Sequence, residues 1–308
     1  MTVYLPIAEL SISLFYLIGI GAAVGFLSGL FGVGGGFLLT PLLVFSGVPS
    51  AIAVASVTSQ VVASSTSGAL SHYRRKGIDY QLAACLIASS TVGSVIGVAI
   101  FNALRRGGQL DLLISLGYVI LLSFVGSLML LESVRSLLRA RRGIVIRRLP
   151  NQHGWLHRLP LRVRFKRSRL YMSVIPVLVI GLFIGIVGAL LGVGGGFILV
   201  PALVYLLRIP GNVVVGTSLL QVVAMMAVTT VLHAVQGGSV DILLAFWLMA
   251  GGTVGAQFGA SAGKNLKGEQ LRLLLALLIL AIAARFGSVL VLPPDNPYSV
   301  VVTAVGQS

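Results

Sequence analysis

Long apolar runs with almost no charge recur along this chain of 308 residues. Four of them, at 79–101, 111–131, 239–260 and 271–284, contain at most one charged residue each. A helix needs about 20 residues to cross a bilayer core about 30 Å thick, and most of these runs come close to that length or exceed it. Backbone groups in hydrocarbon must be satisfied within helices or closed barrels, and the runs lack the alternation of barrel strands. The pattern predicts an all-α integral membrane protein.

The apolar pattern occurs twice. Residues 32–41 have the sequence GVGGGFLLTP and residues 192–201 have GVGGGFILVP, so eight of ten positions are identical. Further matches follow in the same order, with shifts of one or two residues: Gln60 with Gln221, His72 with His233, and Asp79 with Asp241. So many ordered matches indicate an internal duplication.

Each copy holds five apolar segments. They fall near 12–31, 36–46, 51–71, 79–101 and 111–131 in the first copy, and near 172–191, 196–207, 212–233, 239–260 and 270–291 in the second. The second segment of each copy has only 11 or 12 residues and follows three consecutive glycines, which disfavour a continuous helix. The sequence therefore predicts about ten hydrophobic helices, two of them short or broken.

Five crossings per copy would give the two copies opposite orientations in the membrane. Basic residues concentrate in cytoplasmic loops, and 12 of the 22 Lys and Arg residues fall between Arg135 and Arg169. With that stretch inside, the basic loop 74–76 is also inside, and its uncharged counterpart 236–239 is outside. Only Arg105 and Arg106 depart from this pattern. The charges favour inverted repeats, although two short segments that fail to cross would leave parallel ones.

Composition agrees with a membrane protein, because only 9% of the residues are charged and the mean hydropathy is +1.03. Soluble domains carry roughly a quarter charged residues. The net charge of +15 comes largely from the basic stretch, for which anionic lipid is a better partner than nucleic acid. We divide the chain into a first transmembrane repeat at 1–133, a basic cytoplasmic linker at 134–170, a second repeat at 171–292 and a C-terminal tail at 293–308.

The first candidate site is the pair of glycine triplets, Gly34-Gly35-Gly36 and Gly194-Gly195-Gly196. A glycine-rich stretch that opens a helix presents unpaired N–H groups, and the helix dipole favours an anion there. Broken helices of duplicated transporters place such ends at the bilayer midplane. The alternative is that the glycines only permit close helix packing. Two matched triplets before short segments favour an anion site.

The second candidate is a polar face on the third segment of each copy. Ser56 and Gln60 follow helical spacing and correspond to Thr217 and Gln221 in the second copy. A buried glutamine is costly without partners, so a matched pair favours a shared polar cavity. Hydrogen bonds between helices are the competing explanation.

Other polar residues give weaker signals. His72 and His233 end these same segments, where they would suit a helix C-terminus or act in gating. Asp79 and Asp241 open the following helices and are expected to be N-terminal caps. The sequence contains no metal-ligand spacing, nucleotide-binding fingerprint or hydrolase elbow, so it predicts no metal, no cofactor and no enzyme activity.

The duplicated Gly-Val-Gly-Gly-Gly-Phe-x-Leu-x-Pro motif, each time followed by a Ser/Thr-rich helix ending near a histidine, resembles the TauE/SafE family of membrane permeases, also called the sulfite exporter family. The resemblance covers roughly residues 12–290, while the basic linker is longer than expected for the family. It implies transport of sulfite or an organosulfonate such as sulfoacetate, mostly outward, across a bacterial inner membrane. The residues themselves indicate only a small anion.

The sequence therefore predicts a permease that exports a small sulfur-containing anion by alternating access. The anion would lie between the two glycine triplets, with Ser56, Gln60, Thr217 and Gln221 as side-chain donors. Three alternatives stay open: a passive anion channel with the same lining, a membrane-embedded enzyme, and a scaffold that docks through its basic linker. The expected partners are this anion and the lipid bilayer, and the sequence leaves room for a homo-oligomer.

Overall fold

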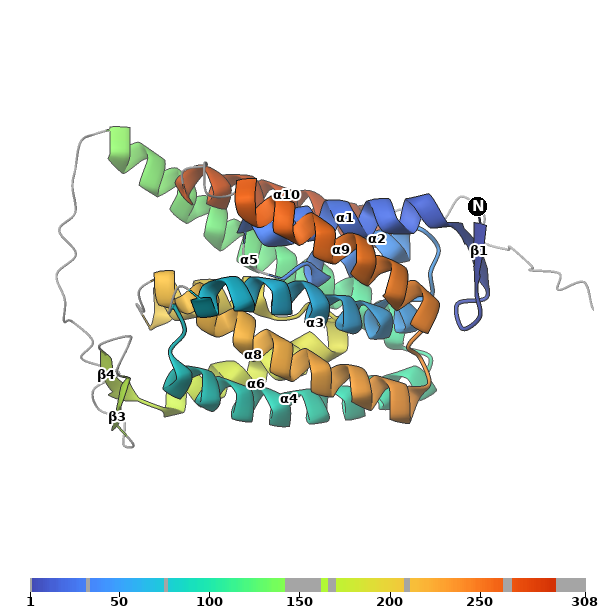
Figure 1. The fold of residues 1–308 in the computed structure, drawn as a ribbon, viewed down its shortest axis with the longest axis horizontal. Helices are drawn as coiled ribbons and strands as arrows, with labels where there is room; N and C mark the ends of the chain where they lie inside the picture. The colour runs from blue at the N-terminus through green and yellow to red at the C-terminus, as the bar shows by residue number, and fades with distance from the viewer. Residues whose placement is uncertain are drawn as a thin grey trace, which may run out of the picture.

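A computed structural model describes residues 2–31, 34–74, 77–141, 162–165, 170–207, 211–262 and 268–291. Within these residues the chain forms ten α-helices, two π-helical turns and two β-hairpins. The long helices lie side by side in an elongated bundle (Figure 1). Most of the predicted basic linker and all of the predicted C-terminal tail fall outside the described residues.

The elements of the first copy begin with a short hairpin, which five helices follow. In order they are β1 (Thr2–Leu5), β2 (Leu10–Ser13), α1 (Leu14–Phe31), α2 (Gly36–Phe45), α3 (Ser50–Arg74), α4 (Tyr80–Arg106) and α5 (Leu110–Arg141). The five predicted segments are all present as helices. The fifth helix continues to Arg141, beyond the predicted start of the linker at 134.

The second copy repeats this order. Its elements are β3 (Arg162–Phe165), β4 (Leu170–Ser173), α6 (Ile175–Leu191), α7 (Gly196–Pro201), the π-helix η2 (Ala202–Leu206), α8 (Gly211–Leu232), the π-helix η3 (His233–Gly237), α9 (Ile242–Ala262) and α10 (Gly268–Val291). The predicted short segment 196–207 is thus a six-residue α-helix that continues as a π-helical turn.

The two hairpins extend the duplication beyond the predicted helices. β1 pairs antiparallel with β2, Thr2 opposite Ser13, and β3 pairs with β4 in the same register, Arg162 opposite Ser173. The prediction of helices alone was therefore incomplete, because four-residue strands carry too little periodicity to be recognised. The hairpins lie at opposite ends of the bundle, β1 at one end and β3 and β4 at the other (Figure 1).

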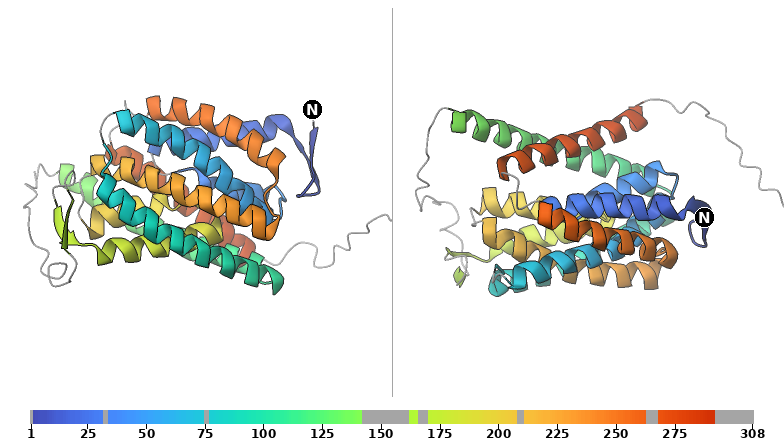
Figure 2. Two further views of the ribbon diagram at one scale, coloured as in Figure 1. Left: turned by 60° about the horizontal axis from the view of Figure 1, so that its bottom comes forward. Right: turned by 45° about the horizontal axis from the view of Figure 1, so that its top comes forward.

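The main helix pairs join one copy to the other. α1 packs on α9, and their counterparts α6 and α4 pack on each other. α3 packs on α8, and α5 on α10; the last pair crosses along one side of the bundle (Figure 2). The apolar core is therefore built between the copies, and neither copy could bury its own apolar faces alone.

Small residues allow these helices to touch through their backbones. A Cβ atom placed on Gly25 of α1 would overlap the carbonyl of Gly252 in α9, and one on Gly255 would overlap the carbonyl of Ala22. The counterpart pair behaves alike, because a Cβ on Gly185 of α6 would overlap the carbonyl of Ser90 in α4. In lipid, where apolar side chains gain little by meeting one another, such close approach is a main source of helix association.

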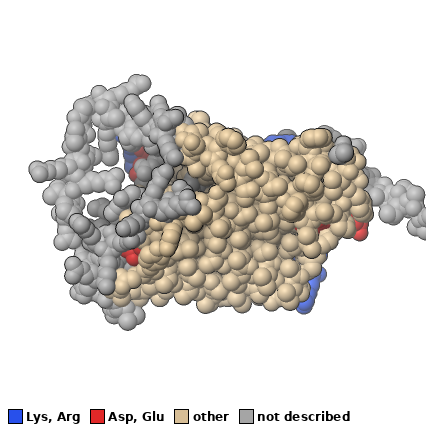
Figure 3. Space-filling view, viewed as in Figure 1, with Lys and Arg blue, Asp and Glu red and all other residues tan. Residues whose placement is uncertain are grey.

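The outer surface suits a membrane. Among the described residues, five helical segments are long and apolar enough to cross a bilayer: Leu14–Phe31, Tyr80–Arg106, Leu110–Arg135, Val213–Gly237 and Ile242–Ala262. Large apolar side chains point outward, such as Phe124 (65% exposed) and Phe258 (67% exposed). The broad middle of the face in Figure 3 is free of charged side chains. A protein dissolved in water would not expose so much apolar surface.

The contact between α1 and α9 can be tested with two glycines of the same helix. We expect Gly25→Ala to lower the free energy of unfolding by about 1–3 kcal/mol, because the new methyl group must push α9 away. Gly19→Ala is the matched control, since a Cβ on Gly19 has nothing within 4 Å. The apparent unfolding temperature of the purified protein in detergent measures both. Equal effects of the two changes would contradict the packing described here.

Candidate functional site

Glycine turns break the helix path once in each copy. α1 ends at Phe31 and α2 begins at Gly36, while α6 ends at Leu191 and α7 begins at Gly196. Gly34 and Gly194 have φ angles of +78° and +74°, which residues with a side chain rarely adopt. The end of α6 is held by Tyr118 of α5, whose hydroxyl donates to the carbonyl of Leu191 at 2.7 Å. The predicted breaks are therefore present in both copies.

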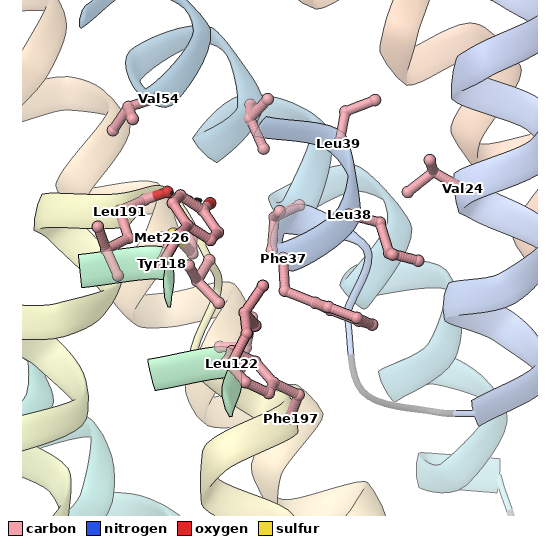
Figure 4. Close-up of a cluster of buried hydrophobic side chains, with 14 of the residues drawn as sticks. Val24, Phe37, Leu38, Leu39, Val54, Tyr118, Leu122, Leu191, Phe197 and Met226 are labelled. Atoms are coloured by element: carbon pink, nitrogen blue, oxygen red, sulfur yellow. Dashed lines mark hydrogen bonds between the residues drawn. The ribbon is translucent and has the colours of Figure 1, made fainter. Parts of the chain in front are cut away.

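The two turns meet inside the bundle. Phe37 and Phe197, the residues that follow the two triplets, stack with ring centroids 5.1 Å apart and an interplanar angle of 29°. A Cβ on Gly36 would overlap the carbonyl of Gly192 at the start of the other turn. Figure 4 shows both rings among buried apolar side chains such as Leu122 and Met226. The turns thus lie in the core and away from the lipid-facing surface.

Helix α3 runs past both turns. Val61 of α3 lies 2.7 Å from a Cβ placed on Gly36 and 2.8 Å from one placed on Gly194. Val222, its counterpart in α8, also lies within van der Waals distance of the Gly194 position, at 3.6 Å. The predicted glutamines immediately precede these two valines, so the structure brings α3, α8 and both turns together.

The glutamine amides are buried and poorly satisfied. Gln60 and Gln221 are both 0% exposed. Neither amide atom of Gln60 has a hydrogen-bond partner, and its Nε2 lies against Gly252 of α9, where a Cβ would overlap it. Gln221 donates only to the sulfur of Met225, at 3.4 Å, and its Oε1 has no partner. Amides this deep in a protein normally have partners, so these atoms keep hydrogen-bonding capacity that no described residue uses.

Ser65 is a further residue of this kind, and the sequence reasoning missed it. Its hydroxyl is buried without a partner and lies 3.6 Å from a Cβ placed on Gly34. Ser65 follows Val61 by one helical turn, so it belongs to the side of α3 that faces the glycine turns. The predicted polar stripe ran through Ser56 and Gln60 instead, because only the folded chain shows which side of α3 faces the turns.

Ser56 and Thr217 are already engaged within the protein. The hydroxyl of Ser56 accepts from the backbone N–H of Asp241 at 3.0 Å, and that of Thr217 accepts from the N–H of Asp79 at 3.1 Å. Thr217 also donates to the carbonyl of Val213 at 2.7 Å. The bond from Asp241 to Ser56 and the bond from Asp79 to Thr217 each run from one copy to the other. We call these two contacts the reciprocal locks.

The aspartates of the reciprocal locks cap the helices that follow them, as predicted. Asp79 accepts from the N–H groups of Gln81 and Leu82 at the start of α4. Asp241 accepts from Leu244 at 3.1 Å with one carboxylate oxygen. Its other oxygen accepts from the backbone of Ile7 at 3.0 Å and of Ala8 at 3.3 Å, in the turn of the N-terminal hairpin. Asp241 therefore fastens α9, α3 and the hairpin to one another.

The two predicted gating histidines lie in different surroundings. His233 is fully buried, its Nε2 donates to the carbonyl of Ala189 at 3.2 Å, and its ring meets the Phe101 ring edge-on at 4.6 Å. His72 is half-buried, and its Cβ lies 3.0 Å from a Cβ placed on Gly216 of α8. A role of either residue in gating stays a prediction. Among the described residues, no three His, Cys, Asp or Glu side chains come together as a metal site would need.

Comparison with known proteins identifies the family. The family described as "Sulfite exporter TauE/SafE" matches residues 17–286, which include both glycine turns and all ten helices in whole or in part. The chain belongs to the sulfite exporter TauE/SafE family. The resemblance noted in the duplicated motif is thereby confirmed, and the protein is a multi-pass member of a membrane transporter family.

Relatives in this family are similar over nearly their whole length. A "Probable membrane transporter protein" of Xylella fastidiosa (strain 9a5c) is 31% identical over 279 residues, covering 88% of this chain and 94% of that protein. The "Probable membrane transporter protein YjnA" of Bacillus subtilis (strain 168) is 28% identical over 267 residues, covering 86% and 96%. No solved structure is significantly similar to the chain.

The carboxylate of Asp241 leads to a test of how the N-terminal hairpin is held. We expect Asp241→Ala to lower the free energy of unfolding by at least about 2 kcal/mol, because a helix cap and two bonds from the hairpin are lost together. Asp111→Ala is the control, since Asp111 is exposed in the first turn of α5. Thermal unfolding gives the stability, and limited proteolysis reports release of the hairpin. A hairpin that stays resistant in Asp241→Ala would contradict its fastening by this carboxylate.

Proposed function

We propose that the protein is a permease that moves sulfite or an organosulfonate such as sulfoacetate outward across a bacterial inner membrane. The observation that carries this proposal is the set of buried polar atoms without partners along α3 and α8: both amide atoms of Gln60, Oγ of Ser65 and Oε1 of Gln221. Each such atom costs about 1–3 kcal/mol when it is left unpaired. A polar solute passing along these helices would supply the missing partners.

The available donors suit an anion. The Gln60 amide nitrogen and the Ser65 hydroxyl can both donate, and Ser65 lies beside the glycine turn that leads into α2. The first N–H groups of a helix favour negative charge. Family membership supports sulfite as the cargo, because the family description names it. The transported solute is thus a sulfur oxyanion bound by uncharged donors.

The two copies form inverted repeats in the membrane. This part of the proposal is supported by the hairpins at opposite ends of the bundle (Figure 1) and by the symmetric pairing of helices across the copies, in which α3 packs on its equivalent α8 and α5 on its equivalent α10. The basic stretch between the copies lies in the cytoplasm, where it would contact anionic lipids. The membrane-spanning units are the two repeats, and the glycine turns meet where they cross.

The reciprocal locks act as the gates of alternating access. Ser56 holds Asp241, and Thr217 holds Asp79, in equivalent positions of opposite copies. Opening one face would break one lock and leave the other closed, so the anion would never meet an open path to both sides. The N-terminal hairpin is fastened to the Asp241 lock and therefore moves with that gate.

Outward movement of an anion needs no coupling ion. A membrane potential that is negative inside favours exit by about 2.3 kcal/mol per charge for each 100 mV. Within the described spans, carboxylates are found at helix ends, such as Asp79 and Asp241, where they serve as caps. Export driven by the potential alone is therefore the simplest mechanism for this chain.

The glutamines supply the direct test of the site. We expect Gln60→Leu combined with Gln221→Leu to lower sulfite flux into proteoliposomes at least about tenfold, equivalent to about 1.4 kcal/mol of lost interaction. The double variant should fold normally, because it removes unpaired atoms. Gln81→Leu, on the exposed start of α4, is the control. Unchanged flux for sulfite and for sulfoacetate in the double variant would refute the site.

Trans-stimulation separates a carrier from the channel alternative. Under alternating access, unlabelled sulfite on the far side should accelerate uptake of labelled sulfite several-fold, because the loaded protein reorients in both directions. The comparison uses proteoliposomes with and without internal sulfite at the same total osmolarity. Flux that ignores internal sulfite and rises without saturation would favour a channel.

A further inference from the structure

A pocket of about 420 Å³ lies at the C-terminal end of α4, where the two copies meet. It is lined by Ala99, Asn102, Ala103 and Arg106 of α4 and by Gln236 of η3. Gln236 begins the segment that leads to Asp241, so the pocket borders the lock that holds the N-terminal hairpin. This end of the bundle is opposite the end at which β3 and β4 lie (Figure 1).

The wall of the pocket is fixed by hydrogen bonds between the copies. The amide nitrogen of Asn102 donates to Oε1 of Gln236 at 3.3 Å. Arg105 donates to the carbonyl of Gly237 at 2.8 Å and to the hydroxyl of Ser239. Arg105 therefore holds the segment before Asp241 against α4.

Arg106, the neighbouring arginine, does not hold the two copies together in this way. Its guanidinium forms no hydrogen bond or ion pair with any residue that the structure describes, and no Asp or Glu lines the pocket. Arg105 and Arg106 are also the two charges that depart from the distribution of basic residues expected for this topology. The bonds of Arg105 to Gly237 and Ser239 explain why an arginine stands at that position, whereas no bond to a described residue explains Arg106. An unpaired guanidinium beside carboxamides is well suited to an oxyanion, which it can bind with two parallel hydrogen bonds.

We propose that this pocket binds an oxyanion, a sulfite, sulfonate or phosphate group, with Arg106 as its charged donor and the free Nε2 of Gln236 as a neutral one. The group can belong to a free ion in the aqueous phase or to the headgroup of an anionic lipid. The proposal does not depend on the transport path along α3 and α8. A bound group would touch both copies beside the Asp241 lock and would favour its closed form.

Binding of free sulfate to the full-length protein in neutral detergent at low ionic strength is the first arm of the test. It is measured by calorimetry in the Gln60→Leu/Gln221→Leu background, so that the transport path does not contribute. We expect Arg106→Gln to weaken sulfate binding at least about tenfold, and Arg106→Lys to recover part of the loss. Arg285→Gln, which removes an exposed arginine of α10 that lines no part of the pocket, should leave it within about twofold.

Lipid is the second arm. Native mass spectrometry counts phosphatidylglycerol retained by the same variants from vesicles of phosphatidylcholine with and without phosphatidylglycerol. Loss of sulfate binding in Arg106→Gln supports a free oxyanion, and loss of phosphatidylglycerol alone supports a lipid headgroup. If Arg106→Gln and Arg285→Gln behave alike in both arms, the proposal is wrong. If the wild-type protein did not transport sulfite or sulfoacetate, the proposed function would be wrong, but the binding results for Arg106 would still decide the present proposal.

Discussion

Backbone-to-backbone contact between the two copies is the constraint on which the rest of this structure depends. Apolar side chains gain little from meeting one another in lipid, so the helices are held by close approach at small residues. Gly25 and Gly255 provide this on the α1–α9 pair, and Gly185 on the α4–α6 pair. Because these pairs always join one copy to the other, the glycine turns of both copies are carried to the same place in the core, where Phe37 stacks on Phe197.

On this nearly symmetric frame the side chains are not symmetric. Ser64 and Ser65 of α3 correspond to Met225 and Met226 of α8, and the methyl group of Met225 packs 2.7 Å from a Cβ placed on Gly188. Methionine adapts its shape to fill such gaps. The first copy therefore contributes hydroxyl groups near its glycine turn, whereas the second contributes thioethers. Of these four residues, only Ser65 of the first copy has an unpaired hydroxyl. The proposed path therefore has a polar wall from the first copy and an apolar wall from the second.

The segment from Gln236 to Asp241 lies between the proposed oxyanion pocket and the Asp241 lock. It is held to α4 through Asn102 and Arg105, to α3 through Ser56, and to the N-terminal hairpin through the Asp241 carboxylate. All these bonds cross between the copies. A movement of one copy against the other must therefore break or shift them together, and ligands at this end of the bundle would act on the same movement.

The sequence by itself determined the membrane class, the duplication, most helix boundaries to within a few residues (the end of α5 at Arg141 is the exception) and the aspartate caps. These follow from local rules: the length of apolar runs, matched motifs, and the hydrogen-bonding needs of helix ends. Only the tertiary structure decided that Ser56 and Thr217 bond to the opposite copy, that Ser65 faces the glycine turn, and that Gln60 has no partner. Such facts depend on which face of α3 meets which neighbour, and a helix with polar residues on several sides does not encode that choice locally. The two hairpins escaped prediction because their four-residue strands are too short to show a recognisable periodicity, and because part of what holds the first one, the bonds from Ile7 and Ala8 to Asp241, comes from the other copy.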